Sequence, residues 1–474
     1  MKLPLLSALV LACAAFAPAA DHPNIIYILV DDAGYGDFGC YGQKTLTTPN
    51  IDRLAAEGMR FTRHYAGCTV CAPSRCVLMT GLHNGHGRVR GNGDWTIPDT
   101  DMTVPKMLKG AGYTTACIGK YGLGKPLPED DPQRKGFDHF FGYVDTSHAH
   151  NCYTTFLVRN GVRFPLDNHL ISGSEKLPGT GVATPDGRKQ WAPQLLAEDV
   201  QAWLGDRGKD KKPFFLYYAL NLPHANNEAG KGSPLGHGLE SPSYGEFASR
   251  DWPDVEKGFA SIIRFIDDQV AAVLAKLKEQ GLDENTIVFF SSDNGPHQEG
   301  LHKVDFFDSN GAERGMKRDL TEGGVREPFI ARWPGKIQPG STSDLISGFQ
   351  DLMPTAADLA GAQVQGECDG ISFLPTLLGN AKEQKKHDYL FWNFMEQGGK
   401  RSVLQWPWKL IHLNTGVMDQ KPAGKAKAQA PAKPLIVELY NLDSDPAEET
   451  NVADKNPDTV KKLEKLMQES YREP

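Results

Sequence analysis

Four short apolar segments constrain the fold more than any other feature of this sequence. Each is rich in β-branched and aromatic residues and has the length of a strand that is buried on both faces. Stretches with helical periodicity lie between them, most clearly over residues 255–280. This alternation predicts an α/β fold in which a mostly parallel central sheet is sandwiched by helices. The four segments are residues 24–30, 114–118, 213–220 and 286–290.

The composition changes after about residue 379, where shorter segments with alternating aromatic residues begin. These segments predict a small antiparallel sheet that is closed by a helix. We therefore expect a main domain over residues 21–379 and a smaller C-terminal α+β subdomain over residues 380–474. The expected elements are strands at 389–394, 406–413 and 436–442, a helix at 459–471, and a flexible surface loop at 421–433.

The N-terminus has the pattern of a secretory signal peptide over residues 1–20. Lys2 precedes an apolar run that ends at Phe16, and small residues suited to cleavage follow. The run is too short to span a bilayer, and no later segment qualifies. We expect a secreted or periplasmic protein, with a lipoprotein processed at Cys13 as the less favoured alternative. The formal net charge of -8 argues against a nucleic-acid binder.

Charged and polar residues follow the four predicted strands. The carboxyl ends of parallel strands meet at one edge of a sheet, and ligands bind beyond that edge. We therefore expect acids, a base and a histidine to converge there. The residues are Asp31, Asp32, Lys120, His224, Asp293 and Asn294.

The acidic members of this set predict a metal site. Packed carboxylates repel each other unless a cation lies among them, and oxygen ligands suit Ca²⁺ or Mg²⁺. The alternative is that both acidic pairs are turn residues, because Asp and Asn favour turns. Two such pairs at the ends of buried strands favour the metal. Lys120 and Lys317 are candidates to hold an anion, and His224 is a candidate to protonate a leaving group.

The segment Gly67–Gly81 holds a candidate nucleophile, Cys71. Pro73 and the terminal glycine predict a short helix over residues 73–80, with Cys71 at its N-terminus. Free N–H groups and the helix dipole favour negative charge there, and Arg75 comes one turn later. A nucleophile beside an anion-binding position suggests hydrolysis of an anionic ester.

Two other interpretations of this segment remain open at this point. Cys68 and Cys71 have a redox-type spacing, and together with Cys76 they have the spacing of a metal knuckle. Seven cysteines follow the signal peptide, so at least one of them is unpaired.

Several motifs, in this order, resemble those of the type I sulfatases of the alkaline phosphatase superfamily. Cys71-Ala-Pro-Ser-Arg75 matches the sulfatase pattern Cys-x-Pro-Ser-Arg. The similarity covers nearly the whole mature sequence. The other matching blocks are Asn24–Asp32, Gly119-Lys120, Pro223-His224, Ser292–Gly295 and Gly315–Gly324.

The resemblance implies an alkaline-phosphatase-like fold and assigns a role to each candidate residue. Cys71 would be converted to formylglycine (3-oxoalanine) by a formylglycine-generating or sulfatase-maturing enzyme, and the aldehyde hydrate would be the nucleophile. Arg75 would stabilise the ionised hydrate, Lys120 and Lys317 would bind sulfate oxygens, and His224 would act at the leaving oxygen. The metal, Ca²⁺ or alternatively Mg²⁺, would be held by Asp31, Asp32, Asp293, Asn294 and the residue at position 71.

The sequence departs from the family pattern at two places. Sulfatases commonly have Gly-Lys-Trp-His, whereas this chain has Gly119-Lys-Tyr-Gly122 and so lacks the second histidine. His148 and His150 are the candidates to replace it or to contact the substrate. The extended pattern also continues to Thr-Gly-Arg, whereas Leu82 stands here in place of the arginine.

The favoured function is an exported sulfatase that acts on a sulfated carbohydrate of galactose or N-acetylgalactosamine type. The substrate class rests on the resemblance. One alternative is a phosphonate or phosphate monoester hydrolase of the same superfamily. Another is a protein that binds sulfated glycans and keeps an unconverted cysteine.

Overall fold

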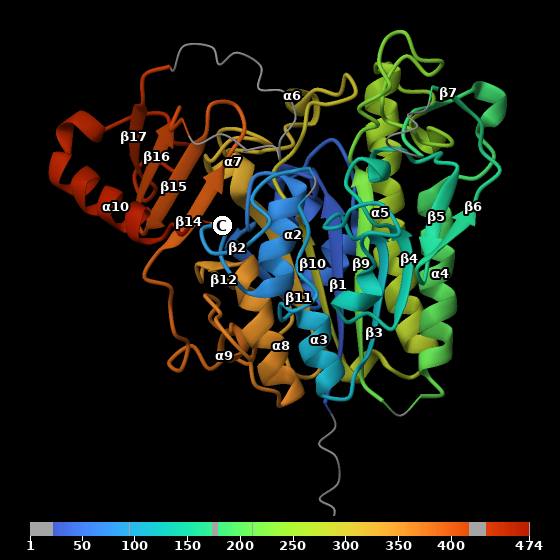
Figure 1. Ribbon diagram of the computed structural model, residues 1–474, viewed down its shortest axis with the longest axis horizontal. Helices are drawn as coiled ribbons and strands as arrows, with labels where there is room; N and C mark the ends of the chain where they lie inside the picture. Colours follow the sequence, from blue (N-terminus) through green and yellow to red (C-terminus); the bar gives the residue numbers. More distant parts are fainter. Residues whose placement is uncertain (1–21, 94, 173–178, 211, 417–432, 474) are drawn as a thin grey trace, which may run out of the picture.

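A large sheet forms the central layer of the computed structural model, which describes residues 22–93, 95–172, 179–210, 212–416 and 433–473. Within these residues the sheet has eleven strands, and its middle strands are parallel (Figure 1). A short strand, β13 (Ser347–Gly348), pairs with β2 beside this order. The spatial order is β12 (Ser341–Ser343), β2 (Met59–Tyr65), β11 (Arg326–Arg332), β10 (Thr286–Ser292), β1 (Asn24–Asp31), β9 (Phe214–Pro223), β3 (Thr114–Lys120), β4 (His139–Tyr143), β5 (Phe156–Arg159) and β6 (Val162–Pro165).

The four apolar segments predicted from the sequence are the neighbouring strands β10, β1, β9 and β3. Each pairs in parallel with the next, so their carboxyl ends lie at the same edge. Antiparallel strands flank this parallel centre on both sides, with β11 beside β10 and β5 beside β4. The predicted fold class, a mostly parallel sheet between helices, is confirmed.

Helices cover both faces of the sheet, and β1 shows why. Its residues are fully buried and alternate between two apolar cores. Ile26 and Ile28 pack in the core beneath the first group of helices, whereas Ile25 and Tyr27 pack beneath the second. Figure 1 shows the second group in front of the sheet. The first group is α1 (Pro49–Ala56), α4 (Ala192–Arg207) and α5 (Asp254–Glu279), and the second is α2 (Cys71–Thr80), α3 (Val104–Gly110) and α8 (Leu352–Ala360).

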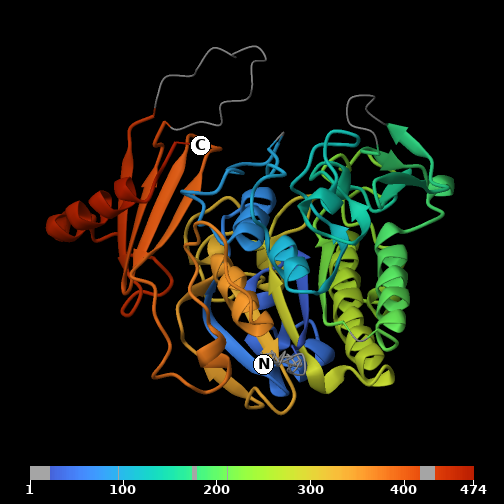
Figure 2. The same cartoon turned by 60° about the horizontal axis from the view of Figure 1, so that its bottom comes forward.

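A second sheet, antiparallel and four-stranded, lies beside the main domain within the described part of the chain (Figure 2). Three of its strands coincide with the predicted aromatic segments. The strand β15 was not predicted, because its alternation begins with two charged residues. Helix α10 packs Leu463 and Met467 against the outer face. The elements are β14 (Leu390–Phe394), β15 (Lys400–Gln405), β16 (Trp408–Leu413), β17 (Ile436–Asn441) and α10 (Pro457–Glu469).

Two local predictions need correction. Helix α2 starts at Cys71, two residues earlier than predicted, so Pro73 is its third residue and not its first. The second concerns residues 121–190, whose Gly and Pro residues predict long loops. These residues hold β4, β5 and β6 and the small pair β7 (Leu170–Ser172) and β8 (Val182–Ala183). These strands are short, and β6 is exposed along its whole length, so they lack the apolar runs that reveal a buried strand.

Several expectations lie outside the described residues. They are the signal peptide over residues 1–20, the alternative processing at Cys13, and nearly all of the loop over 421–433. The expected domain boundary near residue 379 falls between α9 (Leu374–Leu377) and β14. Over the part of the chain that the structure describes, no helix combines the length and apolarity needed to cross a membrane.

Candidate active site

Three carboxylates and a thiol meet at the carboxyl edge of the parallel strands. Asp31 ends β1, Asp32 follows it, Asp293 follows β10, and Cys71 is the first residue of α2. One ligand atom from each of the four residues lies within 4.8 Å of the others. All four side chains are buried with no exposed surface. The predicted convergence of strand-end acids is therefore present, and the helix N-terminus brings Cys71 to it.

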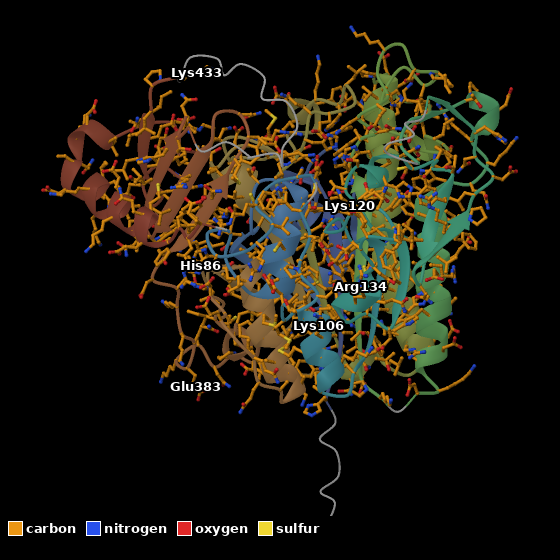
Figure 3. All side chains as sticks on the ribbon, in the orientation of Figure 1. His86, Lys106, Lys120, Arg134, Glu383 and Lys433 are labelled. Atoms are coloured by element: carbon orange, nitrogen blue, oxygen red, sulfur yellow. The ribbon has the colours of Figure 1, made fainter. Side chains whose placement is uncertain are left out.

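Three buried cations balance these carboxylates. Lys120 Nζ lies 2.6 Å from Asp31 Oδ2, in the middle of the molecule where Figure 3 labels this lysine. Lys317 Nζ lies 2.7 Å from Asp32 Oδ2. The guanidinium of Arg75, one turn into α2, lies 2.8 Å from Asp293 Oδ2 and 3.4 Å from Asp31 Oδ1.

The pKa directions show that the carboxylates are unequal. Burial raises the pKa of Asp31, but Lys120 and Arg75 outweigh it and hold that pKa well below its ordinary value. Burial and the nearby charge of Asp31 raise the pKa of Asp293. Without a further cation, the repulsion among the carboxylates therefore disfavours the ionised form of Asp293 most.

The residues fit a hard divalent cation. The Oδ1 atoms of Asp31 and Asn294 are buried and have no hydrogen-bond partner among the described residues. The amide of Asn294 donates from Nδ2 to Asp32 Oδ1 at 2.7 Å, which brings Asn294 to the cluster. Carboxylate and amide oxygens are the ligands of Ca²⁺ and Mg²⁺. A divalent cation would leave two positive charges in the site, enough to balance one sulfate monoester and one anionic nucleophile.

The redox and metal-knuckle interpretations of the cysteines gain no support. The described residues contain no disulfide, and all seven described cysteines are free. Cys68 donates a weak hydrogen bond to the carbonyl oxygen of Asn393, and Cys76 packs in the core behind α2. Burial and the charge of Asp31 raise the pKa of the Cys71 thiol well above its ordinary value. A reactive thiolate at this position is therefore unfavourable.

A cavity of about 280 Å³ adjoins the cluster. His224 and Lys317, which both contact Asp32, line it, and so does His150. The walls come from five separate loops and from the C-terminal subdomain. The other lining residues are Asn92, Gly93, Gly124, Lys125, Pro126, Asp145, Thr146, Ser147, Asn227, Arg318 and Glu396.

Comparison with protein families gives a match to the sulfatase model over residues 23–362, which is most of the chain. The chain belongs to the sulfatase family. It is a sulfuric ester hydrolase. A second model, the C-terminal region of N-sulphoglucosamine sulphohydrolase, matches residues 313–420.

Individual sulfatases resemble the chain over most of its length. Human arylsulfatase A is 32% identical over 479 residues, covering 97% of this chain and 89% of the relative. Rat N-acetylgalactosamine-6-sulfatase is 34% identical over 399 residues, covering 80% of this chain and 69% of the relative. A solved structure from work on the metabolism of multiple glycosaminoglycans by Bacteroides thetaiotaomicron is 26% identical, with a TM-score of 0.72 and coverage of 95% and 99%.

The histidines of this sulfatase occupy different environments. His224 follows β9; its Nδ1 lies 2.7 Å from the carbonyl oxygen of Ala225 and its Nε2 lies 3.1 Å from Lys317 Nζ. Burial and the Lys317 charge hold the pKa of His224 well below its ordinary value, so the free ring is neutral. His150 stacks on this ring, with centroids 4.6 Å apart and 9° between the planes.

His148, predicted with His150 as a substrate contact, does not line the cavity. Its Nε2 is paired with the hydroxyl of Thr154 at 2.7 Å, and its ring packs on Phe156. Burial lowers the pKa of His148 to about 3. Of the two histidines, only His150 is placed to reach a substrate.

The position of the missing second histidine is tightly packed. Gly122 has a φ of +69°, and an added Cβ would lie 3.3 Å from Arg75 Cδ and 3.4 Å from Lys120 Cε. The hydroxyl of Thr146, on the segment that carries His150, donates to the Gly122 carbonyl oxygen at 3.0 Å. A glycine therefore suits this backbone conformation and leaves Arg75 and Lys120 undisturbed.

Sequence reasoning missed Glu299 and Arg318, which extend the network of charges around Lys317. Glu299 accepts from Lys317 Nζ at 3.0 Å and from Arg318 Nη1 at 2.6 Å. Burial raises the pKa of Glu299, but the charges of Lys317 and Arg318 outweigh it and hold that pKa far below its ordinary value. Arg318 immediately follows the candidate Lys317, and this adjacency was the signal in the sequence that could have identified it as a site residue. Glu299 lies in a segment without a regular pattern.

Proposed function

We propose that this sulfatase is exported and hydrolyses sulfate esters of a carbohydrate of galactose or N-acetylgalactosamine type. In this proposal Cys71 is converted to formylglycine by a maturing enzyme, and Ca²⁺ occupies the carboxylate cluster. The observation that carries the proposal is the meeting of Asp31, Asp32, Asp293 and Cys71 within 4.8 Å. A bound cation would relieve the repulsion that remains at Asp293, and a thiol between carboxylates is a poor nucleophile unless it is modified.

The metal and the formylglycine would each supply one kind of chemistry. When bound, Ca²⁺ would orient the nucleophile and offset the negative charge of the sulfate. The formylglycine hydrate would supply the oxygen that attacks sulfur and would release sulfate when it reverts to the aldehyde. The metal ligands would be Asp31, Asp32, Asp293, Asn294 and the modified residue at position 71.

In this proposal, side chains of the protein stabilise the nucleophile and bind the sulfate. Arg75 lies against Asp293 and Asp31, where it stabilises an ionised nucleophile at the start of α2. Lys120, which contacts Asp31, and Lys317, which contacts Asp32, would be the donors for the sulfate oxygens. Because their ammonium groups are buried, these charges are worth more than they would be in water.

The leaving oxygen would meet the pair formed by Lys317 and His224. Nδ1 of His224 is the donor toward the carbonyl oxygen of Ala225, so its Nε2 accepts from Lys317. Burial lowers the pKa of Lys317, but the charges of Asp32 and Glu299 outweigh it and raise that pKa. The ammonium would therefore keep its proton and stabilise the departing oxygen by a hydrogen bond, while His224 holds it in place. His150, stacked on His224, would contact the same part of the substrate.

The carbohydrate assignment is supported by the cavity and by the relatives. Its polar lining, which includes Asn92, Lys125, Asp145 and Asn227, offers partners for the hydroxyl groups of a sugar. A relative that is 34% identical is named N-acetylgalactosamine-6-sulfatase. The test is to measure sulfate release from defined sulfated monosaccharides and oligosaccharides, with Cys71→Ala as the control. Activity confined to sulfated galactose or N-acetylgalactosamine supports the proposal, and activity only on other sulfates contradicts the substrate class.

A related assay tests the alternative that the protein is a phosphonate or phosphate monoester hydrolase. With a divalent cation bound, the buried charges would suit a sulfate monoanion better than a phosphate dianion. We therefore expect faster hydrolysis of nitrophenyl sulfate than of nitrophenyl phosphate or phosphonate. A preference for phosphate or phosphonate would contradict the proposed substrate chemistry.

A further inference from the structure

A turn from Met316 to Asp319 carries the cationic side of the cavity. The N–H of Asp319 donates to the carbonyl oxygen of Met316 at 2.8 Å, so Lys317 and Arg318 are the two central residues. Lys317 reaches Asp32 and His224, and Arg318 lines the cavity beside Glu299. The orientation of both side chains depends on the conformation of this turn.

The turn is strained at Arg318, whose φ is +79°. This value is that of the third residue of a type II turn, a position that normally takes glycine or asparagine. An arginine persists there only where surrounding groups hold the backbone in place. We therefore expect hydrogen bonds to the backbone groups on both sides of Arg318.

Contacts from three directions fix the turn. The N–H of Lys317 donates to the carbonyl oxygen of Pro296 at 2.9 Å, and the N–H of Arg318 donates to that of Thr69 at 3.1 Å. These acceptors belong to the segments that carry Asp293 and Cys71. The third contact comes from the C-terminal subdomain, where Lys400 is the first residue of β15.

Lys400 holds the carbonyl side of the turn. Its Nζ donates to the Arg318 carbonyl oxygen at 2.6 Å and lies 3.1 Å from Asp319 Oδ1. The other carboxylate oxygen of Asp319 accepts from the N–H of Met316 at 3.3 Å, so the lysine and the aspartate close the turn together. The Lys400 side chain is only 12% exposed. Figure 1 shows α7 (Glu322–Val325), which follows the turn, beside β14 and β15.

We propose that Lys400 is a positioning residue for sulfate recognition, through which the C-terminal subdomain holds Lys317 and Arg318 toward the cavity. Lys400 itself does not touch the substrate. The proposal rests on the proposed function, in which Lys317 binds a sulfate oxygen. It means that the smaller subdomain completes the anion-binding side of the active site.

The test is to replace Lys400 with methionine, which keeps the length of the side chain and removes its charge. Lys400→Met should lower kcat/KM for nitrophenyl sulfate about tenfold to a hundredfold, because small misplacements of catalytic groups have effects of this size. Lys400→Arg should recover part of the loss. The matched control is Lys465→Met on α10, whose lysine is 76% exposed and should leave kcat/KM unchanged.

A double-mutant cycle separates positioning from general stability. In a Lys317→Met background, the further change Lys400→Met should have little additional effect, because Lys317, the sulfate-binding group that it positions, is gone. Wild-type kcat/KM in Lys400→Met would overturn the proposal. So would an equal fold-loss in both backgrounds, or a loss explained by the unfolded fraction measured by circular dichroism.

Binding of inorganic sulfate gives a readout that does not depend on turnover. Isothermal titration of the Cys71→Ala protein should show about tenfold weaker sulfate binding when Lys400→Met is added. Unchanged sulfate affinity would overturn the positioning role. Failure of the wild-type protein to hydrolyse any sulfate ester would instead refute the proposed function, while the sulfate titration would still decide the role of Lys400.

Discussion

Replacing Arg75 with leucine removes the cation that separates two buried carboxylates. Its guanidinium lies 3.4 Å from Asp31 Oδ1 and 2.8 Å from Asp293 Oδ2, and none of the three side chains has exposed surface. Loss of one partner from a buried ion pair leaves an uncompensated charge and costs about 3–5 kcal/mol. Because Arg75 serves two carboxylates, we expect the upper part of this range for protein without added divalent cations.

The assay is equilibrium unfolding in urea, with Arg53→Leu as the matched control. Arg53 forms an ion pair with Glu57 at 3.9 Å, but its side chain is 50% exposed, so its removal should cost about 0–1 kcal/mol. Added Ca²⁺ should narrow the stability gap between the Arg75 variant and the wild type, because a ligand that binds the folded state stabilises it. A loss in Arg75→Leu no larger than that in Arg53→Leu would refute the role given to the buried charges.

Three further predictions concern the metal and the histidines. Chelation of divalent cations should abolish sulfate release and lower the thermal midpoint, and Ca²⁺ should restore both; full activity without metal would contradict the cluster's assignment. His150→Ala should lower kcat/KM about tenfold or more, whereas His148→Ala should mainly cost about 1–3 kcal/mol of stability. Equal losses of kcat/KM in the two variants would show that the different roles given to these histidines are wrong. Burial lowers the pKa of His387, but Asp351, 2.7 Å away, outweighs it and raises that pKa above 6.5. The protonated pair therefore stabilises the fold below about pH 6.5 and loses this effect as pH rises through the raised pKa. His387→Gln should accordingly cost more in urea unfolding at about pH 5.5 than at about pH 8.5, and equal costs would disprove the ionic contribution.

The parallel centre of the fold was predictable because β1, β3, β9 and β10 are buried on both faces. Such strands appear in the sequence as continuous apolar runs. The same logic located the strand-end acids, since parallel strands bring their carboxyl ends together. The outer strands were missed for the opposite reason. The exposed strand β6 and the charged start of β15 lack an apolar pattern, and their pairing is decided by neighbouring strands.

The candidate site was predictable where residues belong to motifs, and less so where distant segments meet. Cys71, Arg75 and Lys317 lie in blocks that a single sequence reveals. Glu299 and Lys400 become visible only when the turn around Arg318 is in place, because the sequence does not encode which segment a loop contacts. The choice between His148 and His150 likewise depended on a ring orientation that spacing does not define.

The state of Cys71 in active protein tests the central claim most directly. The measurement is mass spectrometry of the peptide that spans Cys71, made on preparations in which expression of a sulfatase-maturing enzyme is graded. The account predicts that sulfate-releasing activity rises in proportion to the fraction of peptide that carries the aldehyde in place of the thiol. Full activity in a preparation whose peptide carries only the thiol would contradict the account.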